Sequence, residues 1–190
     1  MERNKFYSLM DELITNKHNE LLPKKTGRFA KAWDFEGNAV GQIGEEFVKR
    51  IFQDNDALVE ENNKTIHNEF DILYQGNKIE IKTAKIGRNK SSNGTFQFNG
   101  INPKYNYAMI ILIGIESDVV KYRIIPKKDI NYIHNDRQYK VKYNVNGVEK
   151  TKALVSMNPG NEVNKKLTLS SKELYDDIEN LFININNLLK

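Results

Sequence analysis

Glu69-Phe-Asp-Ile-Leu-Tyr-Gln-Gly-Asn-Lys-Ile-Glu-Ile-Lys-Thr83 is the stretch that decides the fold. Apolar and polar residues alternate on both sides of Gln75-Gly76-Asn77, and this period of two predicts a β-hairpin with glycine in the turn. A loop that is symmetric about the Gln75–Gly76 bond places four apolar side chains on one face, as a half-buried hairpin requires. A three-residue loop would mix the two faces. The four residues are Phe70, Ile72, Ile79 and Ile81.

The other face of this hairpin predicts a hydrolytic site. The symmetric register pairs Asp71 with Glu80 and Glu69 with Lys82. Like charges directly opposite each other destabilise a sheet, and Mg²⁺ would relieve the repulsion because it prefers carboxylate ligands. Lys82 projects from the same face, where it could orient or deprotonate a water or stabilise charge on a phosphate. The alternative is a solvent-facing hairpin in which Lys82 simply neutralises Glu69 and Glu80.

The composition predicts one soluble domain. The chain has 190 residues, of which 39% are hydrophobic and 28% charged, and these values are ordinary for a globular protein. The longest apolar run, residues 108–115, is too short to cross a bilayer, and the charged N-terminus lacks the features of a signal peptide. We therefore expect a cytoplasmic protein. The absence of cysteine excludes disulfides, thiolate nucleophiles and cysteine-based zinc sites.

The positive charge is concentrated beside the hairpin. Residues 78–105 contain six lysines and arginines but one acid, Glu80, whereas the whole chain has a net charge of +4. Such a concentration suits a polyphosphate partner, although a solvated basic loop is an equally common explanation. Asparagine and glutamine in the same region are suited to reading base edges. The predicted DNA-contacting residues are Lys85, Arg88, Asn89, Lys90, Asn93, Gln97, Asn99 and Lys104.

The remaining elements predict an α/β or α+β fold, with a mixed sheet flanked by helices in a single domain. The C-terminal prediction rests on a capping box, Ser170-Ser-Lys-Glu173, which is typical of a helix start. Helices are expected at 5–22, 41–52 and 171–189, with a short helix from Pro126; a polar loop at 87–100; a buried central strand at 108–115, a further strand at 119–125, and a second hairpin at 138–155 broken at Asn146-Gly147.

Residues 41–126 resemble the PD-(D/E)XK nuclease superfamily, particularly its small type II restriction endonucleases. The matching motif is Asp71 followed, across the hairpin, by Glu80-Ile81-Lys82. Gly41-Gln-Ile-Gly-Glu-Glu-Phe-Val-Lys-Arg-Ile-Phe52 is similar to the first helix of the family, and the polar-aromatic segment from Thr95 precedes a buried strand as it does in restriction enzymes. One position departs from the pattern, because Phe70 stands where the family often has proline.

The resemblance implies a restriction-endonuclease-like fold, with residues 41–126 as the catalytic core. Asp71 and Glu80 would bind Mg²⁺, with Mn²⁺ able to substitute, while Lys82 would assist the attacking water. Glu45, in preference to Glu46, would assist the metal. The implied activity is cleavage of double-stranded DNA at a short site, as a homodimer whose two-fold symmetry matches palindromic DNA, with a companion DNA methyltransferase. The alternatives are a structure-selective nuclease, such as a junction resolvase or phage repair nuclease, and a DNA-binding module without catalysis.

Overall fold

The computed structural model describes residues 3–21, 26–61, 70–87, 94–158 and 160–190, and the fold is mixed α and β, as expected. The α-helices are α1 (Arg3–Leu21), α2 (Gly37–Asp54) and α3 (Leu181–Leu189). Short 3-10 helices are η2 (Ala30–Asp34), η3 (Lys127–Asp129), η4 (Ser171–Glu173) and η5 (Ile178–Asn180). The strands are β1 (Glu60–Glu61), β2 (Ile72–Tyr74), β3 (Asn77–Lys85), β4 (Thr95–Ile101), β5 (Met109–Ile115), β6 (Val120–Pro126), β7 (Ile130–Ile133), β8 (Gln138–Val145), β9 (Val148–Ala153), β10 (Val155–Ser156) and β11 (Lys165–Ser170).

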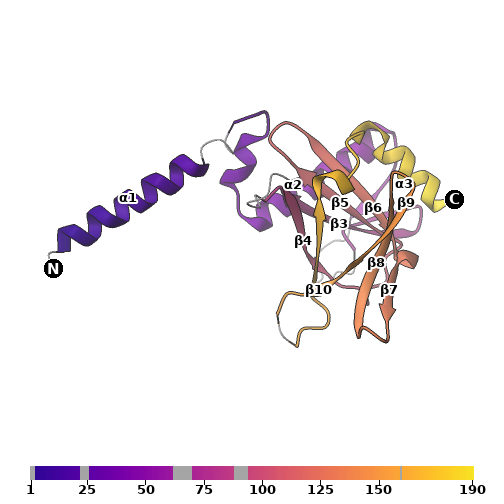
Figure 1. Ribbon diagram of the computed structural model, residues 1–190. Helices are drawn as coiled ribbons and strands as arrows, with labels where there is room; N and C mark the ends of the chain where they lie inside the picture. The colour runs from indigo at the N-terminus through magenta and orange to yellow at the C-terminus, as the bar shows by residue number, and fades with distance from the viewer. Residues whose placement is uncertain (1–2, 22–25, 62–69, 88–93, 159) are drawn as a thin grey trace.

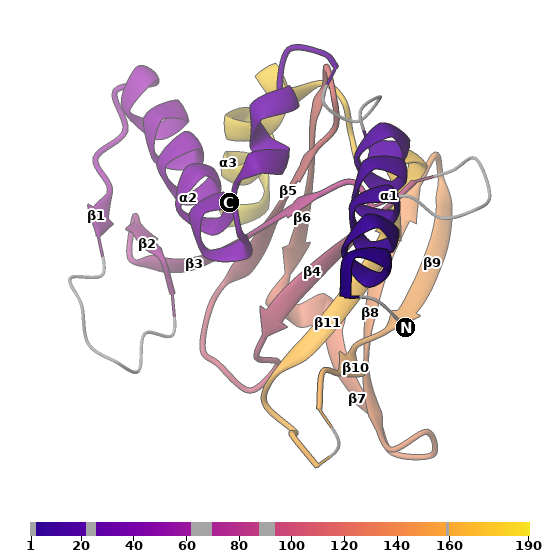
Figure 2. The same ribbon diagram turned by 90° about the vertical axis from the view of Figure 1, so that its left-hand side faces the viewer.

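The central sheet is mixed, in the strand order β1-β2-β3-β5-β6. The β3–β5 pair is parallel, and the other pairs of this sheet are antiparallel. Two smaller antiparallel sheets, in the orders β10-β11-β4 and β7-β8-β9, lie beside it. Helices α2 and α3 cover one face of the central sheet (Figure 2), whereas α1 extends away from the rest of the molecule (Figure 1).

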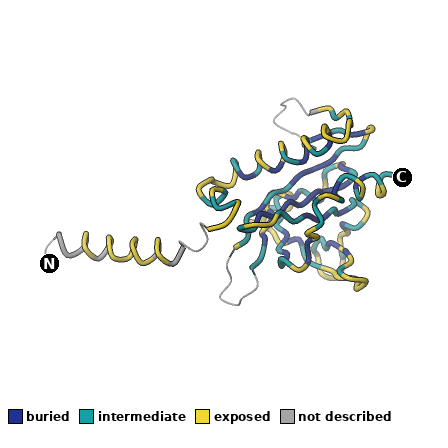
Figure 3. The backbone as a smooth tube through the Cα atoms, turned by 90° about the horizontal axis from the view of Figure 1, so that it is seen from above, coloured by how far each residue is buried: buried dark blue, intermediate teal, exposed yellow. Residues whose placement is uncertain are grey.

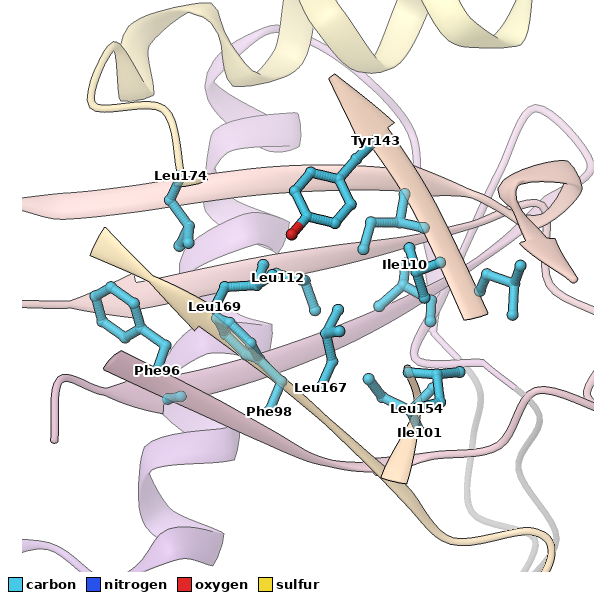
Figure 4. Close-up of a cluster of buried hydrophobic side chains, with 14 of the residues drawn as sticks. Phe96, Phe98, Ile101, Ile110, Leu112, Tyr143, Leu154, Leu167, Leu169 and Leu174 are labelled. Atoms are coloured by element: carbon cyan, nitrogen blue, oxygen red, sulfur yellow. The ribbon is translucent and has the colours of Figure 1, made fainter. Parts of the chain in front are cut away.

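Strand β5 lies between two hydrophobic cores, and every one of its residues is buried. Its side chains alternate between them, because successive residues of a strand point to opposite faces. Ile111 packs against Val48 and Phe52 of α2, while Leu112 packs in a core built with β4, β8 and β11 (Figure 4). In Figure 3 the buried strands form the interior of the body, and the tube of α1 is mostly exposed. The expectation of a fully buried strand at residues 108–115 is confirmed.

The hairpin of β2 and β3 has the predicted register. Ile72 pairs with Ile79, and Tyr74 pairs with Asn77 across a two-residue turn. Gln75 and Gly76 both have positive φ, 49° and 75°, as a tight hairpin turn with the twist of its strands requires. The apolar residues Ile72, Ile79 and Ile81 are buried. The second hairpin, β8–β9, also turns at Asn146-Gly147 as predicted.

Two expectations for the elements are wrong. The region 87–100 is not all loop, since Thr95–Ile101 forms β4, whose aromatic residues Phe96 and Phe98 are buried. The C-terminal helix does not run over 171–189: the capping box opens only the three-residue η4, and α3 begins at Leu181. The helix stops because Tyr175 pairs with Tyr122 of β6 through hydrogen bonds of 2.8 and 2.9 Å between their backbones.

Among the residues that the structure describes, no helix combines the length and apolar character that crossing a bilayer would require.

Candidate active site

The first residue of the site, Asp71, lies directly before β2. Strand β2 pairs with β3 only through residues 77–79, and the Asp71 N–H donates to the carbonyl of Ile79 at 3.0 Å. The Asp71 carboxylate then turns toward β3 and accepts a hydrogen bond of 2.6 Å from the Ile81 N–H. The expected cross-strand pair of Asp71 with Glu80 is therefore not part of the ladder. Instead, the backbone leaves the ladder at Asp71, and the Asp71 carboxylate lies at the open edge of β3, where β2 no longer pairs with that strand.

Glu80 and Lys82 project from the same face of β3, as the period of a strand requires. Glu80 is 7% exposed, and its Oε1 forms an ion pair with Nζ of Lys82. Burial lowers the pKa of the Lys82 ammonium, but the negative charges of Glu80, Asp71 and Glu45 outweigh this effect and raise it. Lys82 is thus a protonated cation held among carboxylates.

The carboxylates of the site are crowded and poorly solvated. Burial raises the pKa of Glu80 to about 7, Lys82 opposes the rise, and the charges of Asp71 and Glu45 add to it. Burial also raises the pKa of Asp71, against the opposing effects of Lys82 and the Ile81 N–H. One lysine therefore does not neutralise this cluster. A bound cation would stabilise the ionised carboxylates.

Helix α2 contributes Glu45 to the same cluster. Burial raises the pKa of Glu45, and the charge of Asp71 raises it further, while Lys82 lowers it. Its neighbour Glu46 points elsewhere: its Oε1 accepts a hydrogen bond of 2.7 Å from Nε of Arg50, and this contact lowers its pKa. Of the two glutamates preferred or weighed from the sequence, Glu45 lies among the charges of Asp71 and Lys82, and Glu46 pairs with Arg50.

A cleft of about 470 Å³ opens beside Lys82. The N-terminal half of α2 forms one wall with Glu45, and β4 forms another with Gln97 and Asn99. Both β4 side chains are exposed, because the alternate residues of β4 face the core. Their amides are therefore available to a ligand that lies over Lys82.

The other predicted DNA-contacting residues are distributed differently. Nζ of Lys85 donates a hydrogen bond of 2.7 Å to the carbonyl of Phe35, so this lysine ties β3 to the segment before α2. Lys104 lies outside the cleft, where its Nζ is 2.9 Å from Oε2 of Glu162. Four of the predicted residues lie outside the described part of the chain: Arg88, Asn89, Lys90 and Asn93.

Three polar residues near the site were not predicted from the sequence. Thr83 Oγ1 and Asn164 Oδ1 are buried at the walls of the cleft, and neither has a hydrogen-bond partner among the described residues. Tyr107 is 2% exposed; burial raises the pKa of its hydroxyl, and the charge of Glu80 raises it further. No local pattern could reveal them, because each approaches the site only through tertiary packing.

The donor chemistry fits a hard divalent cation. Asp71 and Glu80 offer carboxylate oxygens, and Mg²⁺ commonly takes one or two protein carboxylates and completes its shell with water and phosphate oxygens. Within the described residues, no three acidic or histidine side chains converge closely enough to hold a metal by themselves. The pair therefore suits a metal that is shared with a substrate better than a closed structural site.

No family model matches this chain, and no curated protein matches it either. The case for a function therefore rests on the residues and geometry of the site.

Proposed function

We propose that this protein is a Mg²⁺-dependent DNA endonuclease with a restriction-endonuclease-like arrangement of the core. The observation that carries the proposal is the grouping of Asp71, Glu80 and Lys82 at the open edge of β3, where burial raises the pKa of both carboxyls and the charge of Asp71 raises the pKa of Glu80 further. Lys82 and Glu45 line the cleft beside this pair, and strongly perturbed carboxyls next to a cleft are typical of catalytic sites. The mixed sheet, with α2 and α3 on one face, supports the same proposal.

Each residue has a distinct part in the proposed hydrolysis. Asp71 and Glu80 would hold Mg²⁺, which when bound polarises a phosphodiester and favours its attack by water. Lys82 would supply a positive charge and hydrogen-bond donors toward the phosphate and the attacking water, and Glu45 would support the metal. Gln97 and Asn99 would contact the edges of bases, since their amides suit adenine in the major groove.

The direct test is incubation of plasmid DNA with the purified protein and Mg²⁺, or with Mn²⁺ in its place. We expect cleavage by the wild type, and a loss of at least about a thousandfold in Asp71→Asn, because bound metal supplies several kcal/mol and about 1.4 kcal/mol is tenfold in rate. Lys82→Ala should lose cleavage as well. Lys172→Ala, at an exposed lysine of η4, is the matched control and should cleave normally.

The products decide which kind of nuclease this is. Discrete fragments from duplex plasmid would support a type II restriction endonuclease, with a companion methyltransferase that protects the same site. Cleavage restricted to branched DNA would support the alternative, a junction resolvase or phage repair nuclease. Binding of DNA without cleavage in either metal, and equal binding by Asp71→Asn, would contradict the catalytic proposal and leave a DNA-binding module.

A further inference from the structure

A second cavity, of about 560 Å³, lies outside the candidate active site. This volume is within the range of about 300–1,000 Å³ that small-molecule sites occupy. It is an open pocket lined by residues of the strands β7, β8, β10 and β11, which lie together at one end of the molecule (Figure 2). No part of the proposed hydrolysis uses it.

An aromatic surface forms one wall of the cavity. Tyr132 and Tyr139 are cross-strand partners of β7 and β8, with ring centroids 5.1 Å apart. Tyr132 is 43% exposed, which is high for a large aromatic ring. The planes of the two rings meet at 66°, edge to face, and His134 also packs edge to face against Tyr132. The exposed ring of Tyr132 offers a face on which a planar base can stack.

Cationic side chains also line the cavity. Arg137, Lys104 and Lys165 line the cavity together with one acid, Glu162, and that acid is paired with Lys104 at 2.9 Å. Nζ of Lys165 donates a hydrogen bond of 2.7 Å to the Ser156 hydroxyl. Among the described residues, the guanidinium of Arg137 has no ion-pair or hydrogen-bond partner, so its fork of donors is free for a phosphate.

The cavity and the active-site cleft share a wall. Ser156 and Lys165 line the cavity, whereas their chain neighbours Met157 and Asn164 line the cleft. Strands β10 and β11 therefore separate the two spaces by one layer of backbone.

We propose that this cavity binds one unpaired nucleotide, with the base against Tyr132 and Tyr139 and the phosphate against Arg137. The aromatic rings suit the base of a nucleotide, and the unpartnered guanidinium suits its phosphate. A ligand with only a base or only a phosphate would use one of these two features. The nucleotide could belong to a DNA strand or be free in solution, and the two sources share this chemistry. The binding requires neither metal nor cleavage.

The experiment measures binding without divalent metal, in the Asp71→Asn background, so that its outcome is independent of the nuclease proposal. The probes are a short single-stranded oligonucleotide carrying 2-aminopurine, the same strand with an abasic site at that position, and free deoxyadenosine monophosphate. We expect the oligonucleotide to bind with quenched 2-aminopurine fluorescence, and the abasic strand to bind at least about tenfold more weakly, because base–aromatic stacking is lost.

The variants locate the binding in the cavity. Tyr132→Ala and Arg137→Ala should each weaken binding by about tenfold or more, whereas Tyr132→Phe, which keeps the ring, and Lys172→Ala should bind as the parent does. Circular dichroism checks that each variant is folded, as expected for exposed positions. Preferential binding of the free nucleotide would identify it as the ligand. Equal binding of the abasic strand, unchanged binding by both alanine variants, or no binding of any probe would overturn the proposal.

Discussion

Glu45 and Glu46 are adjacent in the sequence but have opposite surroundings. Glu45 lines the cleft and shares the electrostatic environment of Asp71 and Lys82, while Glu46 pairs with Arg50 on the surface of α2. We expect Glu45→Gln to lower the cleavage rate by about 10- to 100-fold, the usual cost of losing a group that supports a metal site. Glu46→Gln should leave the rate unchanged. Single-turnover cleavage assays test the pair, and equal effects of the two substitutions would contradict the assignment.

A second buried glutamate, Glu173, serves stability. Burial raises the pKa of Glu173, but hydrogen bonds from Lys152, Ser170 and Tyr143 outweigh this effect and lower it to about 2. The Lys152 contact is 2.6 Å. Removing the charge with Glu173→Gln should lower the free energy of unfolding by roughly 1.5–3 kcal/mol at neutral pH, the typical value of hydrogen bonds to a charged group.

The stabilisation by Glu173 should depend on pH in a defined direction. Because the carboxyl of Glu173 has a lower pKa in the folded state than its usual 4.5, its stabilisation is complete above that value and is lost as the pH falls toward 2. Urea unfolding should therefore show a wild-type advantage over Glu173→Gln that is constant above about pH 5 and shrinks below it. Glu149→Gln, at an exposed residue 3.4 Å from Lys142, is the control and should change stability little. A pH-independent difference for Glu173→Gln would contradict the argument.

At the scale of elements, the contact between α2 and β3 sets the position of the site. A Cβ at Gly44 would lie 1.7 Å from Thr83 Oγ1, so glycine is required for this close approach. We expect Gly44→Ala to destabilise the fold by about 1–3 kcal/mol through overpacking, and to lower cleavage by moving Glu45 relative to Lys82. The matched control is Gly41→Ala, where a Cβ meets nothing within 4 Å. That substitution should raise stability by up to about 1 kcal/mol.

Thermal unfolding of the two variants measures the difference, and Thr83→Ala provides a rescue. In the double variant Gly44→Ala/Thr83→Ala the Oγ1 atom at 1.7 Å and the Cγ2 atom at 3.0 Å are removed, while the Cβ of residue 83 stays at 2.8 Å from the new methyl group, so the relief is partial. Stability should therefore recover in part relative to Gly44→Ala. A double variant as unstable as the sum of its two single variants would show that the close approach is not the cause.

The elements that could be predicted from the sequence depend on local signals. The β2–β3 hairpin follows from the turn residues Gln75 and Gly76, both of which have positive φ, and from the alternation of apolar and polar residues in the two strands. Both signals are properties of a few adjacent residues. The capping box at Ser170 also forms, yet no long helix follows it, because Tyr175 gains a backbone pairing with Tyr122 that the local pattern does not encode. The same limit applies to the site: its motif residues could be predicted, but the approach of Tyr107 to Glu80 could not.

At the scale of the whole molecule, α1 extends away from the rest of the described chain (Figure 1). Its side chains Met10, Leu13 and Ile14 lie on one stripe and are 56%, 54% and 59% exposed. Most of the stability of a helix in a protein comes from tertiary packing of its apolar face, so we propose that α1 packs against α1 of a second copy of the chain. Two-fold pairing of this kind would make the homodimer that cleavage of a palindromic site requires.

The dimer has a consequence for the products of cleavage. In sedimentation experiments we expect a dimer for the wild type and a monomer for Leu13→Glu/Ile14→Glu, because each charge would be placed at the apolar stripe. The control Ser8→Glu/Asn19→Glu adds the same charges on the opposite face of α1, at exposed residues, and should remain a dimer. Since one active site reaches one strand, the monomeric variant should nick plasmid DNA where the dimer cuts both strands. A monomeric wild type that cuts both strands in a single binding event would contradict this arrangement.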